Sequence, residues 1–214
     1  MSDKIKIDIV SDVVCPWCLI GYKRLEKAIY ELGVNDRVEI EWQPFELNPG
    51  MSAQGEISYD YRSRKYGATK EDTDRQTAYL TRLGAEEGFT FDFFDGIKII
   101  NSQDAHILLD YAKDFGLQTA LNLRLVSAFY SERKDISDRD ILHKELLTVG
   151  LNADEAIKRL DNADARTQIQ REEKHWINKG VTGVPAMFFN SLKPIVGAQS
   201  VSTYKQVLTE ELGL

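Results

Sequence analysis

Polar and apolar residues alternate along residues 4–10, with an apolar side chain at every second position. This two-residue period is typical of a strand that buries one face. From Leu19 to Leu32 the apolar positions recur instead at steps of three and four, which predicts an amphipathic helix that ends at Gly33. Residues 38–42 alternate again. Two strands joined by a helix are expected to be parallel, with a right-handed crossover.

The pattern changes after Pro44, where an irregular segment leads into a long stretch of helical periodicity. Candidate helices cover residues 57–66, 70–87, 102–115, 118–133, 138–149, 153–160 and 163–179. Strand patterns return at 186–190 and 194–197, and a turn at Ser191 and Leu192 joins them, which predicts an antiparallel hairpin. A last amphipathic helix is expected at 200–212.

These elements sum to a β-α-β half, a helical insertion and an α-β-β-α half. We therefore expect one α/β domain in two halves, residues 1–45 and 163–214, with an all-helical insertion domain at residues 46–162. The composition agrees, because 43% of the 214 residues are hydrophobic and 29% are charged, enough for a full core. A net charge of −7 disfavours nucleic acid and anionic membranes as partners.

The first residues lead directly into the strand pattern, without the basic start, apolar region and cleavage site of a secretory signal. The apolar stretches are also too short to cross a bilayer. We therefore expect a cytoplasmic protein. In that reducing compartment a disulfide is more often catalytic than structural.

The only two cysteines stand in the tetrapeptide Cys15-Pro16-Trp17-Cys18, between the first strand and the first helix. Unpaired N–H groups and the dipole at a helix N-terminus stabilise an anion, so Cys15 is a candidate nucleophilic thiolate. Pro16 suits the first helical position because it has no N–H to leave unpaired. Cys18, one turn further on and expected to be less exposed, can resolve a mixed disulfide.

Two other uses of this cysteine pair are weaker interpretations. A structural zinc site needs two further ligands, and the remaining nitrogen donors, His106, His143 and His175, are far apart in the sequence. A purely stabilising disulfide would close a very short loop, so it would restrain the unfolded chain little. Redox or thiolate chemistry is the favoured interpretation.

The cysteine motif after the first strand and Gly183-Val184-Pro185-Ala186 before the third together resemble the thioredoxin fold. The helical insertion narrows this resemblance to the DsbA-like superfamily. Within it, residues 11–18, 42–49, 101–106 and 180–185 resemble the FrnE-like thiol-disulfide oxidoreductases. The resemblance implies an α/β fold class: a thioredoxin fold, β-α-β then α-β-β-α, with a large all-helical insertion domain.

The resemblance also implies roles for single residues. Cys15 would form the mixed disulfide and Cys18 would resolve it. Pro185 would follow a cis peptide bond beside the dithiol and leave the backbone of Val184 free to pair with an extended substrate. Pro16 and Trp17 would complete the substrate-binding surface. No bound cofactor and no metal are implied: the redox centre is the Cys15–Cys18 disulfide, with glutathione as a candidate co-substrate.

Trp17 stands where the strongly oxidising DsbA enzymes carry a histidine. Without that imidazole the Cys15 thiolate is less stabilised, which predicts a reduction potential between the DsbA and thioredoxin values of roughly −120 and −270 mV. Trp17 itself is expected to be exposed near the dithiol. Asp12 would destabilise the thiolate further if its carboxylate lay close, although a turn or capping role is the more ordinary one. His106 is interpreted as a structural histidine.

Phe89, Phe91, Phe93 and Phe94 form the densest aromatic cluster of the chain. Core packing between the insertion and the thioredoxin layer is its simplest role. A peptide-binding surface beside the active site is the alternative.

Three functions remain open. The leading one is a thiol-disulfide oxidoreductase that exchanges disulfides with protein or small-molecule thiols. The second is a glutathione-dependent isomerase or transferase of the 2-hydroxychromene-2-carboxylate isomerase (kappa) type, whose members resemble this architecture but carry a serine at the Cys15 position. The third is a redox-independent chaperone that holds clients against the helical insertion. No motif specifies an oligomeric state.

Overall fold

The computed structural model describes residues 4–190 and 193–214. Its main sheet has four strands in the order β2-β1-β5-β6: β1 (Ile5–Ser11), β2 (Val38–Pro44), β5 (Ala186–Phe189) and β6 (Ile195–Val196). β1 runs parallel to β2 and antiparallel to β5, and β6 pairs antiparallel with β5. The predicted parallel and antiparallel pairings are therefore confirmed. The predicted turn at Ser191 and Leu192 lies outside the described residues.

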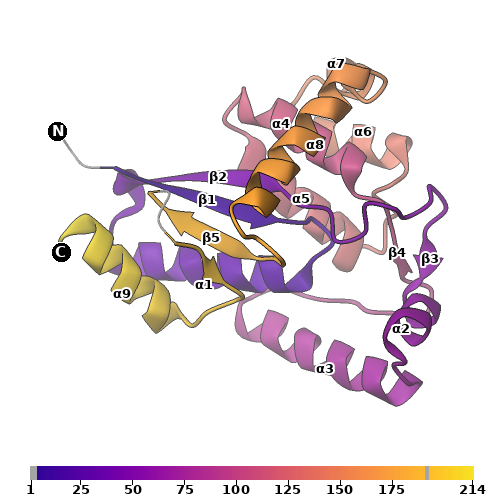
Figure 1. Ribbon diagram of the computed structural model, residues 1–214, viewed down its shortest axis with the longest axis horizontal. Coiled ribbons are helices and arrows are strands. Elements are labelled where there is room, and N and C mark those ends of the chain that lie inside the picture. Colours follow the sequence, from indigo (N-terminus) through magenta and orange to yellow (C-terminus); the bar gives the residue numbers. More distant parts are fainter. Residues whose placement is uncertain (1–3, 191–192) are drawn as a thin grey trace.

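Helices lie on both faces of this sheet (Figure 1). On one face, α1 (Pro16–Leu32) and α9 (Val201–Leu212) share a core with β1. Its fully or almost fully buried side chains include Ile5, Ile7, Ile9, Leu25 and Tyr204. On the other face, α8 (Ala163–Asn178) places Trp176 in a cluster with Val10 and Phe188. Successive side chains of β1 therefore pack against the helices on opposite faces of the sheet, as expected of a strand that lies between two layers of helices.

The chain between β2 and α8 forms helices, connecting loops and one small sheet. It contains β3 (Glu56–Ile57), α2 (Ser58–Tyr66), α3 (Lys70–Glu86), β4 (Lys98–Ile99), α4 (Gln103–Lys113), α5 (Gln118–Tyr130), α6 (Arg139–Thr148) and α7 (Ala153–Arg159). A 3₁₀ turn, Asn35–Arg37, precedes β2. The predicted helices are all present, with ends shifted by a few residues. The antiparallel β3–β4 pair was not predicted, because strands of two residues leave no periodic pattern.

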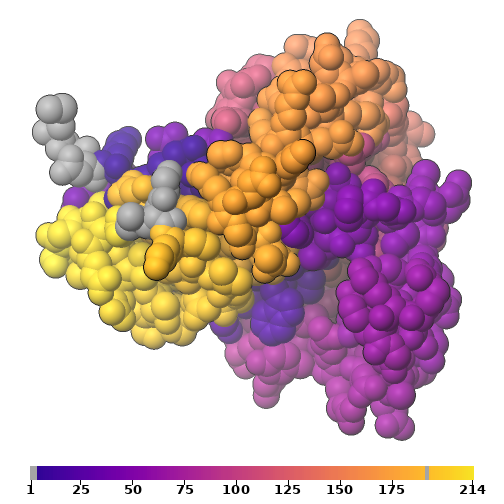
Figure 2. All heavy atoms as spheres, in the orientation of Figure 1, coloured from indigo at the N-terminus to yellow at the C-terminus, as the bar shows by residue number. Residues whose placement is uncertain are grey.

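The insertion has its own core, which continues to the start of α1. Its fully buried side chains include Leu108, Leu121, Leu125, Leu142 and Leu160, and the same cluster takes in Val13, Leu19 and Ile20 beside the cysteines. Figure 2 shows the purple α2 region on the side of the molecule away from the yellow α9, while the orange region extends from the top of the view down to the yellow one. The division of the chain at residues 45/46 and 162/163 remains a prediction.

Gln118 attaches the insertion to the sheet. Its side-chain Oε1 accepts a hydrogen bond from the backbone N–H of Trp42 at 2.9 Å, and its Nε2 donates to the Trp42 carbonyl at 2.9 Å. The indole Nε1 of Trp42 also donates to Oγ1 of Thr119 at 2.9 Å. These three bonds hold the start of α5 against β2, and so fix the insertion relative to the sheet.

Candidate active site

Cys15 and Cys18 lie at the junction between β1 and α1. Cys15 is the N-cap residue of α1, and Pro16 is its first residue. The backbone N–H of Cys15 donates to the carbonyl of Asp12 at 3.0 Å, and that of Cys18 donates to the carbonyl of Cys15 at 3.1 Å. No side chain caps α1, and its first turn carries no acidic residue. The positive end of the helix dipole therefore acts on the thiols without an opposing charge from the helix itself.

Both cysteines are free thiols, and both are buried. The exposed fractions are 4% for Cys15 and 3% for Cys18, so the expected difference in exposure is only one percentage point. The two thiols differ instead in their access to the large cavity described below. Cys15 lines this cavity, whereas Cys18 is not among its lining residues. Burial raises the pKa of Cys18 well above its ordinary value; the Cys15 thiol and the Asp12 carboxylate add to the rise, while a hydrogen bond to the Asp12 backbone opposes it. Cys18 is thus held as a protonated thiol.

The loop before β5 reaches the same place from the other half of the chain. The Val184–Pro185 peptide bond is cis. The thiol of Cys15 donates to the Val184 carbonyl oxygen across 3.9 Å. Gly21 of α1 permits the close approach of this loop, since a Cβ there would lie 3.3 Å from Cγ of Pro185. The structure therefore brings Val184 and Pro185 to the dithiol, although 169 residues separate Val184 from Cys15.

A cavity of about 500 Å³ opens beside Cys15, a volume typical of small-molecule sites. Pro16, Trp17 and Val184 line it near the thiol, while α2, α3, the segment 93–99 and the end of α5 form the remaining wall. Its aromatic lining consists of Trp17, Tyr59, Tyr61, Tyr66, Phe93, Phe94, Phe129 and Tyr130. Charged and polar side chains of the wall include Arg62, Lys70, Thr73, Asp74 and Lys98.

The members of the phenylalanine cluster differ in whether they lie in the core or line the cavity. Phe91 is 3% exposed and belongs to the core, whereas Phe93 and Phe94 line the cavity. Phe91 therefore has the core-packing role, whereas Phe93 and Phe94 form part of the cavity wall. Trp17 was expected to be exposed and is in fact half-buried, because the ring of Tyr79 on α3 lies 6.0 Å from its own.

Tyr130 supports the loop that carries Cys15. Its hydroxyl donates to the carbonyl of Val14 at 2.7 Å, and its ring lines the cavity. Burial raises the pKa of Tyr130 well above its ordinary value, and the nearby thiols and Asp12 raise it further, so the hydroxyl stays protonated and remains a donor. Nothing in the sequence pattern distinguished Tyr130 from the other apolar positions of its helix.

Asp12 has the turn role expected of it and a second one. Its carboxylate accepts hydrogen bonds from the backbone N–H groups of Val14 at 3.3 Å and Leu47 at 2.8 Å. The same carboxylate is 1% exposed, and its Oδ1 lies 3.6 Å from Nε2 of the buried His106. Sequence reasoning considered the two residues separately and missed this pair. The only signal was that His106 falls on the buried face of α4.

Within residues 4–190 and 193–214, no group of three or more histidine, cysteine, aspartate and glutamate side chains is arranged to hold a metal ion. The helices in those ranges include none with the length and apolar character needed to cross a membrane.

Comparison with known proteins places this geometry in a family. The DSBA-like thioredoxin domain family matches residues 6–209. A crystal structure of a probable DsbA oxidoreductase, SCO1869 from Streptomyces coelicolor, superposes with a TM-score of 0.92 and 28% identity, over 98% of this chain and 90% of that one. The uncharacterized protein YwbO of Bacillus subtilis (strain 168) is 26% identical over 208 residues, which are 97% of each chain.

Two more distant structures share the fold. The cytosolic disulfide reductase DsbM from Pseudomonas aeruginosa, solved with GSH, has a TM-score of 0.69 and 20% identity over 98% of this chain and 100% of that chain. A 2-hydroxychromene-2-carboxylate isomerase has a TM-score of 0.71 and 16% identity over 96% of this chain and 95% of that one. With the match across residues 6–209 and the dithiol at the start of α1, the chain belongs to the DSBA-like thioredoxin domain family, a family of thiol-disulfide oxidoreductases.

Proposed function

We propose that this protein is a thiol-disulfide oxidoreductase that works through Cys15-Pro16-Trp17-Cys18. One observation carries the proposal: the two cysteines of the chain stand together at the N-terminus of α1 as free thiols, and Cys15 alone lines a large cavity. A thiol that lines a cavity can attack the disulfide of a substrate bound there. The second thiol, which is buried and protonated one helical turn away, can then resolve the mixed disulfide.

The exchange has two steps. The Cys15 thiolate attacks one sulfur of a substrate disulfide, so that a Cys15–substrate bond forms and the other substrate sulfur leaves as a thiolate and takes a proton. Cys18 then loses its proton and attacks the Cys15 sulfur. The Cys15–Cys18 bond forms, the bond to the substrate breaks, and the second thiolate leaves. Two electrons pass from the dithiol to the substrate, and the reverse sequence oxidises a dithiol.

The cavity supports small-molecule substrates. Pro16, Trp17 and Val184 line it together with Cys15, and the backbone of Val184 can pair with an extended chain or with the peptide backbone of a small thiol. Glutathione fits this description, and DsbM, which shares the fold, was solved with GSH. We propose glutathione disulfide or glutathione as a co-substrate. Since DsbM is named a cytosolic enzyme, we propose the cytoplasm as the compartment of this chain also.

A glutathione-dependent isomerase is the second candidate, because the fold of 2-hydroxychromene-2-carboxylate isomerase is also similar and the cavity has room for a second substrate. That chemistry uses no resolving thiol, so it would survive the change Cys18→Ser. A redox-independent chaperone would keep its ability to suppress aggregation when both cysteines are replaced by serine.

The test is the trapping of the intermediate. Incubated with glutathione disulfide, Cys18→Ser should accumulate a glutathione adduct on Cys15, whereas the wild type should pass through it to the Cys15–Cys18 disulfide. Cys15→Ser is the matched control and should form neither species. Mass spectrometry of acid-quenched samples distinguishes the three states. An adduct absent from Cys18→Ser, or equally present in Cys15→Ser, would rule out the proposed roles.

A further inference from the structure

Four ionisable side chains from four separate segments of the chain lie close together beside the Cys15 loop. They are Asp12 from the loop between β1 and α1, Glu46 from the segment after β2, His106 from α4 and Glu173 from α8. Three of them are almost fully buried, with exposed fractions of 1% for Asp12, 5% for Glu46 and 3% for His106. Such a group is unfavourable in a protein interior unless its charges are paired.

The carboxylates of this cluster have hydrogen-bond donors. Those of Asp12 are the two backbone N–H groups already described. Glu46 accepts from the side-chain amide of Gln103 at 3.3 Å and from that of Asn101 at 3.5 Å. Glu173 accepts from the backbone N–H of Glu46 at 2.7 Å.

The imidazole differs from these carboxylates. Among the described residues, Nε2 of His106 has no hydrogen-bond partner, although the carboxylate of Asp12 lies 3.6 Å away. At that separation a protonated imidazole and a carboxylate attract each other by charge rather than through a formed hydrogen bond.

The charges around His106 favour the imidazolium. Burial acts to lower the pKa of His106, but the negative charges of Asp12, Glu46 and Glu173 outweigh it, and the pKa is raised above its ordinary value. Burial, Glu173 and Asp12 raise the pKa of Glu46, while His106 opposes that rise.

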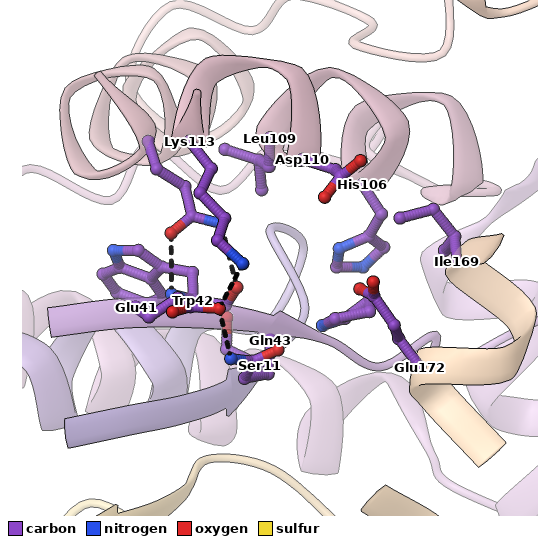
Figure 3. Close-up of a pocket in the computed structure, with 12 residues that line it drawn as sticks. Ser11, Glu41, Trp42, Gln43, His106, Leu109, Asp110, Lys113, Ile169 and Glu172 are labelled. Carbon is purple, nitrogen blue, oxygen red and sulfur yellow. Dashed lines mark hydrogen bonds and ion pairs between the residues drawn. The ribbon is translucent and has the colours of Figure 1, made fainter. Parts of the chain in front are cut away.

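Further charged groups surround the same ring. Figure 3 shows His106 pointing from α4 into a small cavity that it shares with Asp110 and Lys113 of α4 and with Glu172 of α8. Glu41 of β2 also lines this cavity. Lys113 pairs with Glu41. Carboxylates thus outnumber cations around His106, which again favours its protonated form.

Asp12 connects this cluster to the dithiol. Its backbone carbonyl accepts a hydrogen bond from the N–H of Cys15 at 3.0 Å, so its carboxylate lies in the loop that carries the dithiol. After burial and the Cys15 thiol, Asp12 affects the pKa of Cys18 in two ways: a hydrogen bond to its backbone lowers that pKa, whereas the negative charge of its carboxylate raises it, because it opposes a second negative charge on the buried sulfur. An imidazolium beside Asp12 offsets that charge. Protonation of His106 therefore makes the thiolate of Cys18 less costly, even though the ring belongs to the helical insertion.

We propose that His106 is a positioning residue for the release of substrate, in which its imidazolium offsets the charge of Asp12 and so permits Cys18 to ionise. The proposal rests on the thiol-disulfide exchange proposed above. In that step the Cys18 proton passes to solvent, the Cys15–Cys18 bond forms, the bond between Cys15 and the substrate sulfur breaks, and the leaving thiolate is protonated. His106 forms no bond to sulfur; it acts through Asp12.

The test measures how fast the mixed disulfide is resolved. Reduced enzyme is mixed rapidly with excess glutathione disulfide and quenched in acid, and mass spectrometry follows the conversion of the Cys15–glutathione adduct into the Cys15–Cys18 disulfide. We expect His106→Gln to resolve the adduct about tenfold more slowly than the wild type near pH 6, because without the imidazolium the charge of Asp12 opposes the ionisation of Cys18. The two rates should converge at higher pH, where the wild-type imidazole is neutral as well.

Two further variants separate this role from a structural one. Asp12→Asn/His106→Gln removes both charges and should recover most of the lost rate, because no carboxylate is left to offset. His143→Gln is the matched control: His143 also pairs with an aspartate, Asp154, at 2.9 Å, but on the exposed surface of α6. It should match the wild type at every pH. A wild-type to His106→Gln ratio that stays constant with pH, or a double variant as slow as the single one, would overturn the proposal.

A titration covers the case in which these variants fold poorly. The imidazole signals of the three histidines are followed by NMR in the wild type and in Asp12→Asn, and the pKa of His106 should fall in the variant. An unchanged pKa would show that the pair does not interact. A wild type that forms no adduct with glutathione disulfide would instead contradict the proposed function, so the two failures are distinguishable.

Discussion

Replacing Gly84 with alanine tests how tightly α3 packs against the aromatic segment behind the active-site loop. Gly84 is buried in α3. A Cβ at this position would lie 2.7 Å from Cε2 of Phe91 and 2.9 Å from the carbonyl oxygen of Phe89. The backbone of Phe89 has little freedom to move away, because its N–H donates to the Gly84 carbonyl at 2.8 Å.

The strain would reach the loop that carries Cys15. The ring of Phe91 is 3% exposed, and its centroid lies 4.8 Å from that of Phe89 and 5.1 Å from that of Tyr130. Tyr130 in turn donates its hydroxyl to the carbonyl of Val14. A displaced Phe91 ring therefore pushes on the tyrosine that holds the active-site loop.

Two effects of opposite sign determine how much Gly84→Ala changes the free energy of unfolding. Alanine is favoured over glycine inside a helix by about 1 kcal/mol. Overpacking a core costs about 1–3 kcal/mol. The new Cβ would be closer than van der Waals distance to the ring of Phe91 and to the backbone of Phe89, which places Gly84→Ala at the upper end of that range. We expect a net loss of about 2 kcal/mol in the free energy of unfolding. For a chain of this size that lowers the melting temperature by roughly 4–8 °C.

Calorimetry of the reduced protein measures this change. Gly50→Ala is the matched control, since nothing lies within 4 Å of a Cβ at Gly50, and its stability should stay within about 0.5 kcal/mol of the wild type. If Gly84→Ala melts at or above the wild-type temperature, the packing described for α3 and Phe91 is wrong.

Three other changes have defined outcomes. Tyr130→Phe leaves the Val14 carbonyl without its 2.7 Å donor and should cost about 1 kcal/mol in urea unfolding; an unchanged midpoint would mean the bond contributes nothing. Leu108→Ala, at a fully buried position, should cost about 2–5 kcal/mol, and a smaller loss would contradict a well-packed insertion core. Hydrogen bonds from Thr69 and the charge of Arg75 lower the pKa of Asp72 to about 2, so its carboxylate stabilises the fold above the unfolded pKa and loses this effect as pH falls through about 2. Asp72→Asn should therefore melt below the wild type near neutral pH but together with it near pH 2; an equal gap at both would refute the assignment.

The sheet and the dithiol could be predicted because their signals are local. β1 alternates, α1 repeats every three to four residues, and Cys15 falls between them, so the helix N-cap position of Cys15 follows from one short stretch of sequence. The lengths of the helices could also be predicted from the sequence, because capping residues such as Asp138 and glycines such as Gly150 stand at their ends.

The parts that could not be predicted depend on contacts between distant segments. Asp12 lies in the loop between β1 and α1 and His106 lies in α4 of the helical insertion, and no spacing rule links them. Trp17 is half-buried because α3 folds over it, which the sequence around Trp17 does not show. The cavity beside Cys15 likewise exists only once α2, α3 and the segment 93–99 have packed together.

The bond pair between Gln118 and Trp42 also protects the molecule against association through its sheet. β2 is an outer strand, and an outer strand usually offers free N–H and carbonyl groups that can pair with a strand of another molecule. At Trp42 both groups are already bonded to a single side-chain amide, so an incoming strand meets no free donor or acceptor there. At the other edge, β6 is only two residues long. Edge-to-edge pairing of two molecules along β2 is therefore blocked at Trp42 by a side chain of the same molecule.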